Sequence, residues 1–350
     1  MNFVKNIVLL SFILIVGCNK DTENKLDNLF EGTESSLLKA KTILFKESKM
    51  SLDFMFEMLY IDSILLVNEF PNPWYCMKIV NLHTGDIFPF AEKGRGPGQI
   101  NGQAVDYSLD YENRELYITD KKNYYIYSLD SIIKYHTSAR ELKHFSVNLN
   151  NERFMRPIYN GGRIVGGMYD KQFGVFDIEH DTIIKKGDYQ EGGPMAWQSF
   201  YLSHPSQDIV AYFNYLSAGM GFLDLTVDLD INVVEILADE SNARTQISEN
   251  TLKTRPIKGA KNGHIAACTS NQLIYVLYSG KEINQSSLKS LTSSFLSNRV
   301  YVFDWNGKPV KYYDLDCNIR SIAVDPKDEI LYAASYENIP CLVYFDLKNN

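Results

Sequence analysis

The 350-residue sequence predicts an all-β protein, a six-bladed β-propeller of four-stranded blades that is closed by an N-terminal strand completing the last blade. Three observations carry this prediction. A short apolar phrase occurs six times, its copies are spaced by about the length of one blade, and the chain ends one strand short of a complete sixth blade. Repeats of roughly 40 to 50 residues that each hold several strands are typical of propellers.

The repeated phrase is a run of aliphatic and aromatic residues, the types that favour strands. Its clearest copy, Arg299–Trp305, stops at the turn dipeptide Asn306-Gly307. The six copies are Cys76–Leu82, Tyr124–Leu129, Phe173–Ile178, Met220–Leu225, Arg299–Trp305 and Cys341–Leu347. Their last apolar residues lie 47, 49, 47, 80 and 42 positions apart in turn. We expect each copy to be the third strand of a blade.

The interval of 80 positions holds one blade with two polar insertions, not two blades. Before the phrase at Arg299, we expect strands at Asp230–Leu237, Gly263–Thr269 and Leu273–Tyr278. The excess residues fall in two insertions, about Ala238–Asn262 and Lys281–Asn298.

The strand order within a blade is clearest in the second unit. We expect an inner strand at Ala104–Leu109, a second strand at Glu115–Thr119, the phrase at Tyr124–Leu129, and the start of the outer strand at Ile132–Tyr135. The middle strands are apolar at successive positions, which indicates sheets covered on both faces. A β-sandwich would show cleaner alternation.

The chain ends indicate how the ring closes. The sixth unit reaches Leu347 and leaves no room for an outer strand before Asn350. An unassigned strand, Thr42–Phe45, precedes the first blade. We expect it to fill the vacant position and remove an exposed sheet edge, so that the propeller domain covers residues 41–350.

The first residues predict a targeting segment. Lys5 precedes an almost unbroken apolar run, Ile7–Val16, which predicts a signal peptide over residues 1–17. An ordinary secretory signal and an N-terminal membrane anchor are the alternatives, but the run is too short to span a bilayer. No later apolar stretch is long enough either.

The end of that run resembles a bacterial lipobox, Ile15-Val16-Gly17-Cys18. The resemblance implies that the mature protein begins at Cys18, which carries the lipid and holds the protein on a membrane. Residues 18–40 are expected to form the lipidated cysteine and a flexible tether. Lys20, Asp21 and Glu23 resemble the export signals of surface lipoproteins in Bacteroidota. We therefore expect an outer-membrane lipoprotein of the cell envelope, either periplasmic or surface-exposed.

Several blade motifs resemble known propellers. Val105-Asp106 followed by Glu115–Asp120, and Ala323–Pro326 followed by Ile330–Tyr332, are similar to NHL- and TolB-type blades. Gly94–Gln99 resembles the GxGPGE-like turn of TolB-like six-bladed propeller lipoproteins from Bacteroidota, with a glutamine at the position of the expected acid. The resemblance implies the fold and the envelope location, and implies little about chemistry.

The candidate ligand-binding residues lie on loops that a propeller gathers on one face, a common place for binding sites. They are Trp74, Tyr75, Arg95, Arg156 and Trp197. The aromatic rings suit stacking on a ligand, and the arginines suit an anionic or hydroxyl-rich one. Each residue has a structural alternative: the aromatic rings can pack over a blade edge, and Arg95 can hold its glycine-rich turn.

Composition and motifs exclude some functions. The formal net charge of −8 argues against nucleic-acid binding, which needs a basic surface. The six histidines share no metal-ligand spacing, and no hydrolase or metalloprotease motif occurs, so we expect no metal or cofactor. A metal site assembled across blades stays open at this point. The cysteines after Cys18 can be buried thiols or disulfides; they are Cys76, Cys268, Cys317 and Cys341.

Two functions fit the sequence. The first is a monomeric, lipid-anchored binding module that captures a protein or carbohydrate ligand on its loop face. The second is an envelope hydrolase or lyase with a site assembled from several blades in the central channel. Converging acids and histidines in the channel would favour the enzyme, and an aromatic, polar-rimmed surface would favour binding.

Overall fold

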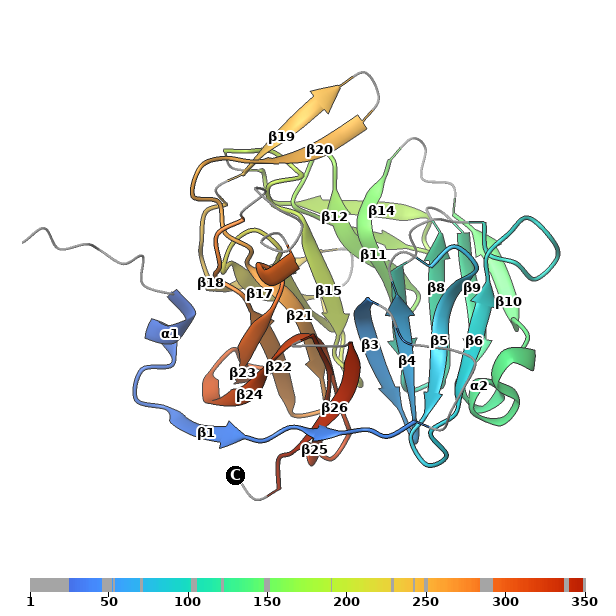
Figure 1. Cartoon of the computed structure of the whole chain (residues 1–350). Coiled ribbons are helices and arrows are strands. Elements are labelled where there is room, and N and C mark those ends of the chain that lie inside the picture. The colour runs from blue at the N-terminus through green and yellow to red at the C-terminus, as the bar shows by residue number, and fades with distance from the viewer. Residues whose placement is uncertain are drawn as a thin grey trace, which may run out of the picture.

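The structure is a computed structural model of the chain, drawn as a ribbon in Figure 1. Its blades are arranged around a central channel that their inner strands line. It describes residues 25–45, 52, 54–69, 72–101, 106–120, 123–147, 152–189, 191–227, 230–241, 243–248, 251–283, 292–336 and 340–348. Four blades are separate four-stranded sheets, and the last two share one sheet, because a single long strand continues from one into the other.

The first two blades contain β3 (Met55–Ile61), β4 (Ile64–Glu69), β5 (Tyr75–Asn81) and β6 (Ile87–Glu92), then β7 (Asp106–Asp110), β8 (Glu115–Asp120), β9 (Asn123–Ser128) and β10 (Lys143–Ser146). The third and fourth contain β11 (Phe154–Asn160), β12 (Arg163–Met168), β13 (Phe173–Asp177) and β14 (Thr182–Lys186), then β15 (Ser199–Ser203), β16 (Ile209–Asn214), β17 (Met220–Asp224) and β18 (Asn232–Leu237). The fifth and sixth contain β21 (His264–Thr269), β22 (Leu273–Tyr278), β23 (Ser297–Asp304), β24 (Pro309–Val324), β25 (Ile330–Ser335), β26 (Cys341–Asp346) and β2 (Lys41–Thr42).

The six-blade prediction is confirmed, and each copy of the phrase is the third strand of its blade. The first part of β24 pairs with β23 in blade five, and its last part pairs with β25 in blade six. Within the described residues, the core divides into six apolar clusters, each between two neighbouring blades. This arrangement explains the continuous apolar runs of the middle strands, because both faces of each sheet are covered.

The predicted closure is also confirmed. β2 pairs antiparallel with β26, and the Ile43 amide extends the ladder by donating to the Leu342 carbonyl over 2.9 Å. Ile43 and Phe45 then pack into the cluster between blades six and one. The vacant outer position of blade six is therefore filled from the other end of the chain.

One strand prediction is wrong. The segment expected to begin the outer strand of blade two is helix α2 (Leu129–Tyr135), followed by the 3₁₀ turn His136–Ser138, and the outer strand β10 comes only at Lys143. The Ser128 side chain caps the helix by accepting from the Ser131 amide. Leu129 and Ile132 are buried together, and this spacing of three belongs to a helix.

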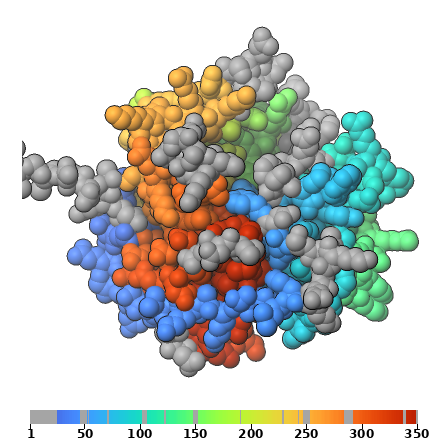
Figure 2. Space-filling model, viewed as in Figure 1, coloured from blue at the N-terminus to red at the C-terminus, as the bar shows by residue number. Residues whose placement is uncertain are grey.

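The segment before the ring differs from the expected flexible tether. Residues 25–38, here called the strap, form α1 (Lys25–Leu29) and β1 (Glu34–Leu38), and β1 adds a parallel strand to the outer edge of β24 in blade five. Figure 2 shows this blue segment lying across the orange and red surface of the last blades. The strap packs because three of its five apolar residues are buried: Leu26 is 0%, Phe30 2% and Leu38 2% exposed. The rest of the predicted tether, residues 18–24, and the lipidation site lie outside the described residues.

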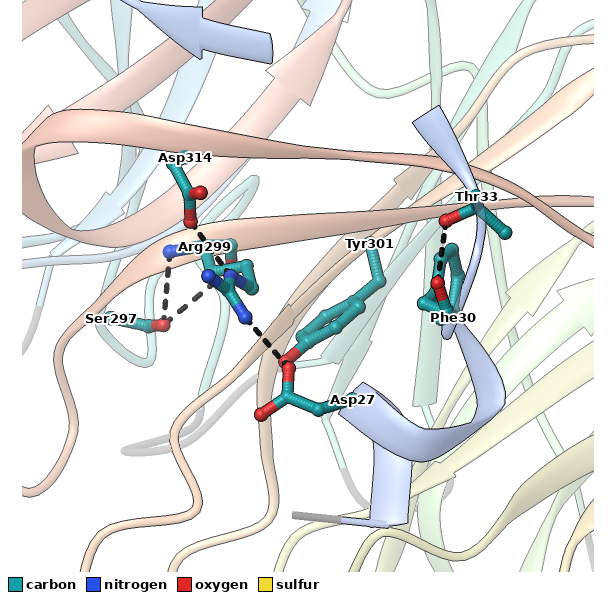
Figure 3. Close-up of polar contacts among 7 residues, drawn as sticks. All are labelled: Asp27, Phe30, Thr33, Ser297, Arg299, Tyr301 and Asp314. Atoms are coloured by element: carbon teal, nitrogen blue, oxygen red, sulfur yellow. Dashed lines mark hydrogen bonds and ion pairs between the residues drawn. The ribbon is translucent and has the colours of Figure 1, made fainter. Parts of the chain in front are cut away.

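Polar contacts also hold the strap (Figure 3). The Asp27 carboxylate lies 2.8 Å from the Arg299 guanidinium and accepts a 2.6 Å hydrogen bond from the Tyr301 hydroxyl. Asp314 approaches the same guanidinium to 2.7 Å. The strap is thus joined to blade five by apolar burial and by a neutralised arginine.

The first insertion carries a two-stranded hairpin of its own, β19 (Ala243–Ser248) and β20 (Thr251–Pro256), which projects from the loop face (Figure 1). No helix in the described part of the chain is long and apolar enough to cross a membrane. The cysteines after the predicted lipidation site are free thiols: Cys76, Cys268, Cys317 and Cys341.

Candidate functional site

The inner strands of all six blades line a narrow central channel of about 110 Å³. At the face formed by the blade-to-blade loops, a wider hollow of about 430 Å³, here called the mouth, adjoins the channel. Arg156, Tyr215 and Ile265 line both spaces, so they mark where the two meet. Both insertions of blade five reach the mouth, the first through Thr254 and Pro256 and the second through Ile283 and Phe295.

Arg156 is the centre of a cross-blade network. Its guanidinium lies 2.6 Å from the Glu57 carboxylate of blade one and 2.8 Å from the Asp106 carboxylate of blade two. It also donates to the Tyr215 hydroxyl of blade four, over 2.6 and 3.1 Å. One arginine therefore joins four blades at the rim of the channel.

A backbone irregularity places Arg156 there. β11 shifts register between Met155 and Ile158, and Arg156 has a φ of 53°, in the left-handed region that side chains rarely adopt. Gly166 lies opposite, where an added Cβ would come within 3.0 Å of the Met155 carbonyl oxygen. Such strain persists only where the surroundings enforce it, and it is concentrated at functional sites.

The network perturbs its titratable groups. Burial, countered in part by Arg156 and reinforced by Glu57, raises the pKa of Asp106 to about 6. Burial disfavours the charged form of Arg156, but Tyr215, Asp106 and Glu57 outweigh it and hold its pKa well above the usual value. The guanidinium is therefore charged, and Asp106 titrates near neutral pH.

A second arginine, Arg320, lines the mouth from the start of the inner strand of blade six. Only 2% of it is exposed. Its guanidinium carbon lies 4.5 Å from the Phe56 ring centroid and 5.6 Å from that of Phe295, and it donates to the Ile265 carbonyl over 2.6 Å. Among the described residues, no carboxylate lies within ion-pair distance, and the buried Nε has no hydrogen-bond partner.

His264 is the buried histidine of the mouth. One ring nitrogen, Nε2, lies 3.1 Å from the Ala218 carbonyl oxygen, which makes it the donor and leaves Nδ1 as a buried acceptor without a partner among the described residues. Burial lowers its pKa to about 4, so the ring is neutral at physiological pH. No group of three or more metal-ligating side chains occurs in the described part of the chain.

The channel also opens toward the opposite face, into a hollow of about 420 Å³. Tyr60, Tyr111 and Thr269 line it together with the channel. A second hollow shares Glu112 with this one. The described residues that line these two hollows include no arginine or lysine. Among the described residues that line these spaces, the arginines thus lie at the mouth and where the channel meets it.

Of the five predicted ligand-binding residues, only Arg156 lines the mouth. Trp74 is 71% exposed on its loop and Tyr75 is half-buried, and both backbone amides donate to the Asn72 side chain. The Trp197 indole donates to the Glu191 carbonyl and lines a separate small hollow with Asn214. Trp74, Tyr75 and Trp197 line neither the channel nor the mouth, so their role in binding stays a prediction.

Arg95 is exposed on a turn that other residues hold together. The Gln99 side chain accepts from the Gly96 amide over 2.8 Å, so its amide oxygen supplies the acceptor that an acid would have supplied. An added Cβ at Gly94 would lie 1.9 Å from that oxygen, so a larger residue there would displace the Gln99 side chain from this position. The hydrogen bonds of the turn therefore do not involve the Arg95 side chain, for which the described residues show no contact.

Sequence reasoning missed the other residues of the mouth and of the adjoining rim of the channel. A usable signal exists: Glu57, Asp106, Arg156 and Arg320 all occupy the first positions of an inner strand, where a charged residue precedes the apolar run. Ring symmetry brings equivalent positions of different blades together. Tyr215 and His264 carry no comparable signal, since tyrosines are frequent throughout this chain and the histidines share no spacing.

Comparison with known proteins agrees with the fold. A model of the TolB-like 6-blade propeller-like family matches residues 56–327. A member of the DUF4221 family from Bacteroides vulgatus has a similar structure, with a TM-score of 0.56 at 9% identity, covering 90% of this chain and 97% of that one. U3-55K gives a TM-score of 0.48 at 8% identity, covering 88% and 98% of the two chains. The comparison with curated proteins finds no match to this chain.

Proposed function

Because the chain belongs to the TolB-like 6-blade propeller-like family, we propose that it is a binding module of the cell envelope that takes its ligand in the mouth of its central channel. The observation that carries this proposal is the mouth itself. It is an open hollow of about 430 Å³, lined by apolar walls and by two arginines that a cross-blade scaffold holds in place. Concave sites with a few fixed polar groups are the usual form of ligand pockets.

Binding is favoured over catalysis because the two carboxylates at the rim of the channel are paired. Glu57 and Asp106 both contact Arg156, and the neutral His264, whose Nδ1 has no partner among the described residues, is a weak base because burial lowers its pKa to about 4. A general base must reach a substrate proton with a free lone pair. One observation supports the alternative, an envelope hydrolase or lyase: the pKa of Asp106 is raised to about 6, which suits a general base.

The anchor is the second part of the proposal. The lipobox-like sequence ending at Cys18 supports a lipid-anchored protein of the outer membrane, and membership of a TolB-like family fits an envelope location. We expect Cys18→Ser to abolish incorporation of radiolabelled palmitate, because the thiol accepts the acyl chain. Equal labelling of the variant and the wild-type protein would refute lipidation at this residue.

The proposed site can be tested by blocking either end of the channel with the same side chain. Gln198 lines the mouth, and the exposed Ser206 lines the opposite hollow. A library of small molecules, sugars and peptides is screened for compounds that raise the melting temperature of the wild-type protein. We expect Gln198→Trp to abolish the stabilisation and Ser206→Trp to preserve it. Ligands that stabilise both variants equally would place the binding site elsewhere.

A further inference from the structure

The mouth carries a buried cation that the described residues leave without an anion. We infer that the ligand bears a carboxylate group that pairs with Arg320. This inference rests on the proposed function, since it names the chemical class of the ligand at the same site.

The charges of the mouth show which arginine is available. Arg156 has two carboxylates within 2.8 Å and a tyrosine hydroxyl at 2.6 Å, so its donors are engaged. Among the described residues, Arg320 has one hydrogen-bond acceptor, the Ile265 carbonyl at 2.6 Å, and Glu57, the neighbouring acid, is already paired with Arg156. Both arginines stand at the start of the inner strand of a blade. Of the two, only Arg320 lacks a carboxylate partner among the described residues.

An unpaired buried charge is costly, because the cation loses its hydration without gaining a counter-ion. Burial lowers the pKa of Arg320 and outweighs the opposing effects of Tyr215, Glu57 and Tyr336, but a guanidinium keeps its proton at any physiological pH. The Phe56 and Phe295 rings recover part of the loss through cation–π contacts. An anionic group of a ligand would offset the remaining cost of burying the charge. Because the site excludes water, the anion would bind strongly.

The surroundings favour a carboxylate on an apolar body over a phosphate. Leu216, Pro256 and Ile283 give the mouth apolar walls. A phosphate dianion would require a second free cation, and Arg156 is committed to Glu57 and Asp106, whose negative charges would repel it. A planar monoanion matches one guanidinium, which can offer two parallel donors.

The test uses matched pairs of probes that differ only in charge: benzoate with benzamide, and hexanoate with hexanamide. Melting temperature and saturation-transfer NMR are measured on the purified wild-type protein, Arg320→Met and Arg299→Met. We expect the carboxylates to bind wild type and Arg299→Met, with at least a tenfold loss of affinity in Arg320→Met. The amides should bind all three proteins weakly and equally.

Several outcomes would overturn the inference. They are equal binding of acids and amides to wild type, no binding of either, and undiminished carboxylate binding to Arg320→Met. If Arg320→Met fails to fold, the preference of the wild-type protein for acids over amides, and its loss in Gln198→Trp, decide the question. A neutral library ligand that Gln198→Trp excludes and Arg320→Met still binds would refute the carboxylate while leaving the proposed function intact.

Discussion

Arg299 in the strap contact and Arg320 in the mouth show two ways in which this fold treats an arginine. Arg299 is one-third exposed, yet two carboxylates contact it within 2.8 Å and a tyrosine ring lies beneath it at 4.6 Å. Arg320 is almost fully buried, and its described partners are one carbonyl and two phenylalanine rings. The more buried cation is thus the less neutralised of the two, the reverse of what stability alone would favour.

The difference separates a contact that serves stability from one that serves binding. At the strap, charge pairing joins segments far apart in sequence, and the channel, the mouth and the other hollows named above include none of the paired residues Asp27, Arg299 and Asp314. At the mouth, the unpaired charge borders an open hollow that a ligand can enter. Functional sites often retain such locally unfavourable features, which the rest of the fold must offset.

The largest predicted effect concerns the strap. Deleting residues 1–24 should leave the free energy of unfolding unchanged. Deleting residues 1–39 removes the buried side chains of Leu26, Phe30 and Leu38. Each contributes about 2 kcal/mol of apolar burial, offset in part by the entropy of ordering the strap, so we expect a net loss of roughly 3 kcal/mol in the free energy of unfolding. Deletion through Phe45 also removes β2 and should destabilise the ring further.

Urea denaturation of the three truncated proteins measures these losses. Equal midpoints for the proteins truncated at Asn24 and at Lys39 would show that the strap adds nothing and that the segment behaves as a tether. Equal midpoints for the truncations at Lys39 and Phe45 would show that β2 does not close the ring.

The next effect is a pH dependence that arises from Asp106 at the rim of the channel and from His264 in the mouth. The pKa of Asp106 rises from 3.8 to about 6 on folding, so the native state binds its proton more tightly, and this stabilisation is lost as the pH rises from about 4 to 6. The pKa of His264 falls from 6.5 to about 4, so its contribution is lost as the pH falls through the same range. The two dependences oppose each other in the wild-type protein.

Asp106→Asn removes one of these dependences. We expect the free energy of unfolding of the variant, followed by urea denaturation between pH 4 and 6.5, to rise with pH more steeply than that of the wild type, by on the order of 2 kcal/mol across the range. Glu31→Gln, at an exposed acid of the strap, is the control and should leave the slope unchanged. Parallel curves for Asp106→Asn and wild type would show that this carboxyl titrates as it does in the unfolded chain.

A smaller effect compares the two arginines directly. Arg299→Met should lower stability by about 1 kcal/mol, because partly exposed ion pairs contribute little each. Arg320→Met should raise the stability of the unliganded protein by about 1 kcal/mol or more, because an apolar side chain of similar length replaces an unpaired buried cation. Thermal unfolding of both variants measures the signs. A destabilised Arg320→Met would show that this arginine holds the mouth together.

The sequence predicted the ring well because the fold depends on repeated local patterns. Six apolar phrases, a missing outer strand and an unassigned N-terminal strand were enough to predict the blades and their closure, because each blade buries both faces against its neighbours. The strap was not predicted, because its burial depends on only three apolar side chains within a polar segment: Leu26, Phe30 and Leu38. Helix α2 was mistaken for a strand because Ile132 and Ile133 favour strands by type, whereas the Ser128 cap decides the local structure.

The candidate site was predicted only in part, because its residues come from different blades. Arg156 was predicted as a loop arginine that could bind a ligand, but its partners Glu57 and Asp106 lie 99 and 50 positions earlier. Whether an arginine is neutralised depends on which strand positions face each other across the channel. The closed ring of blades determines which positions face each other, and the spacing of residues in the sequence does not reveal it.

The smallest effect on stability concerns the exposed rim of the loop face. Trp74 is 71% exposed, so Trp74→Ala should change the free energy of unfolding by less than about 0.5 kcal/mol. If the ligand is a protein or carbohydrate that extends beyond the mouth, this ring is available for stacking, and we expect its loss to weaken binding by roughly 2 kcal/mol. Titration calorimetry with a ligand from the screen makes the measurement, with Asn306→Ala, on an exposed turn of the opposite face, as the control. A ligand that loses affinity in Arg320→Met and keeps it in Trp74→Ala would confine recognition to the mouth, and would remove Trp74, with its neighbour Tyr75, from the binding surface.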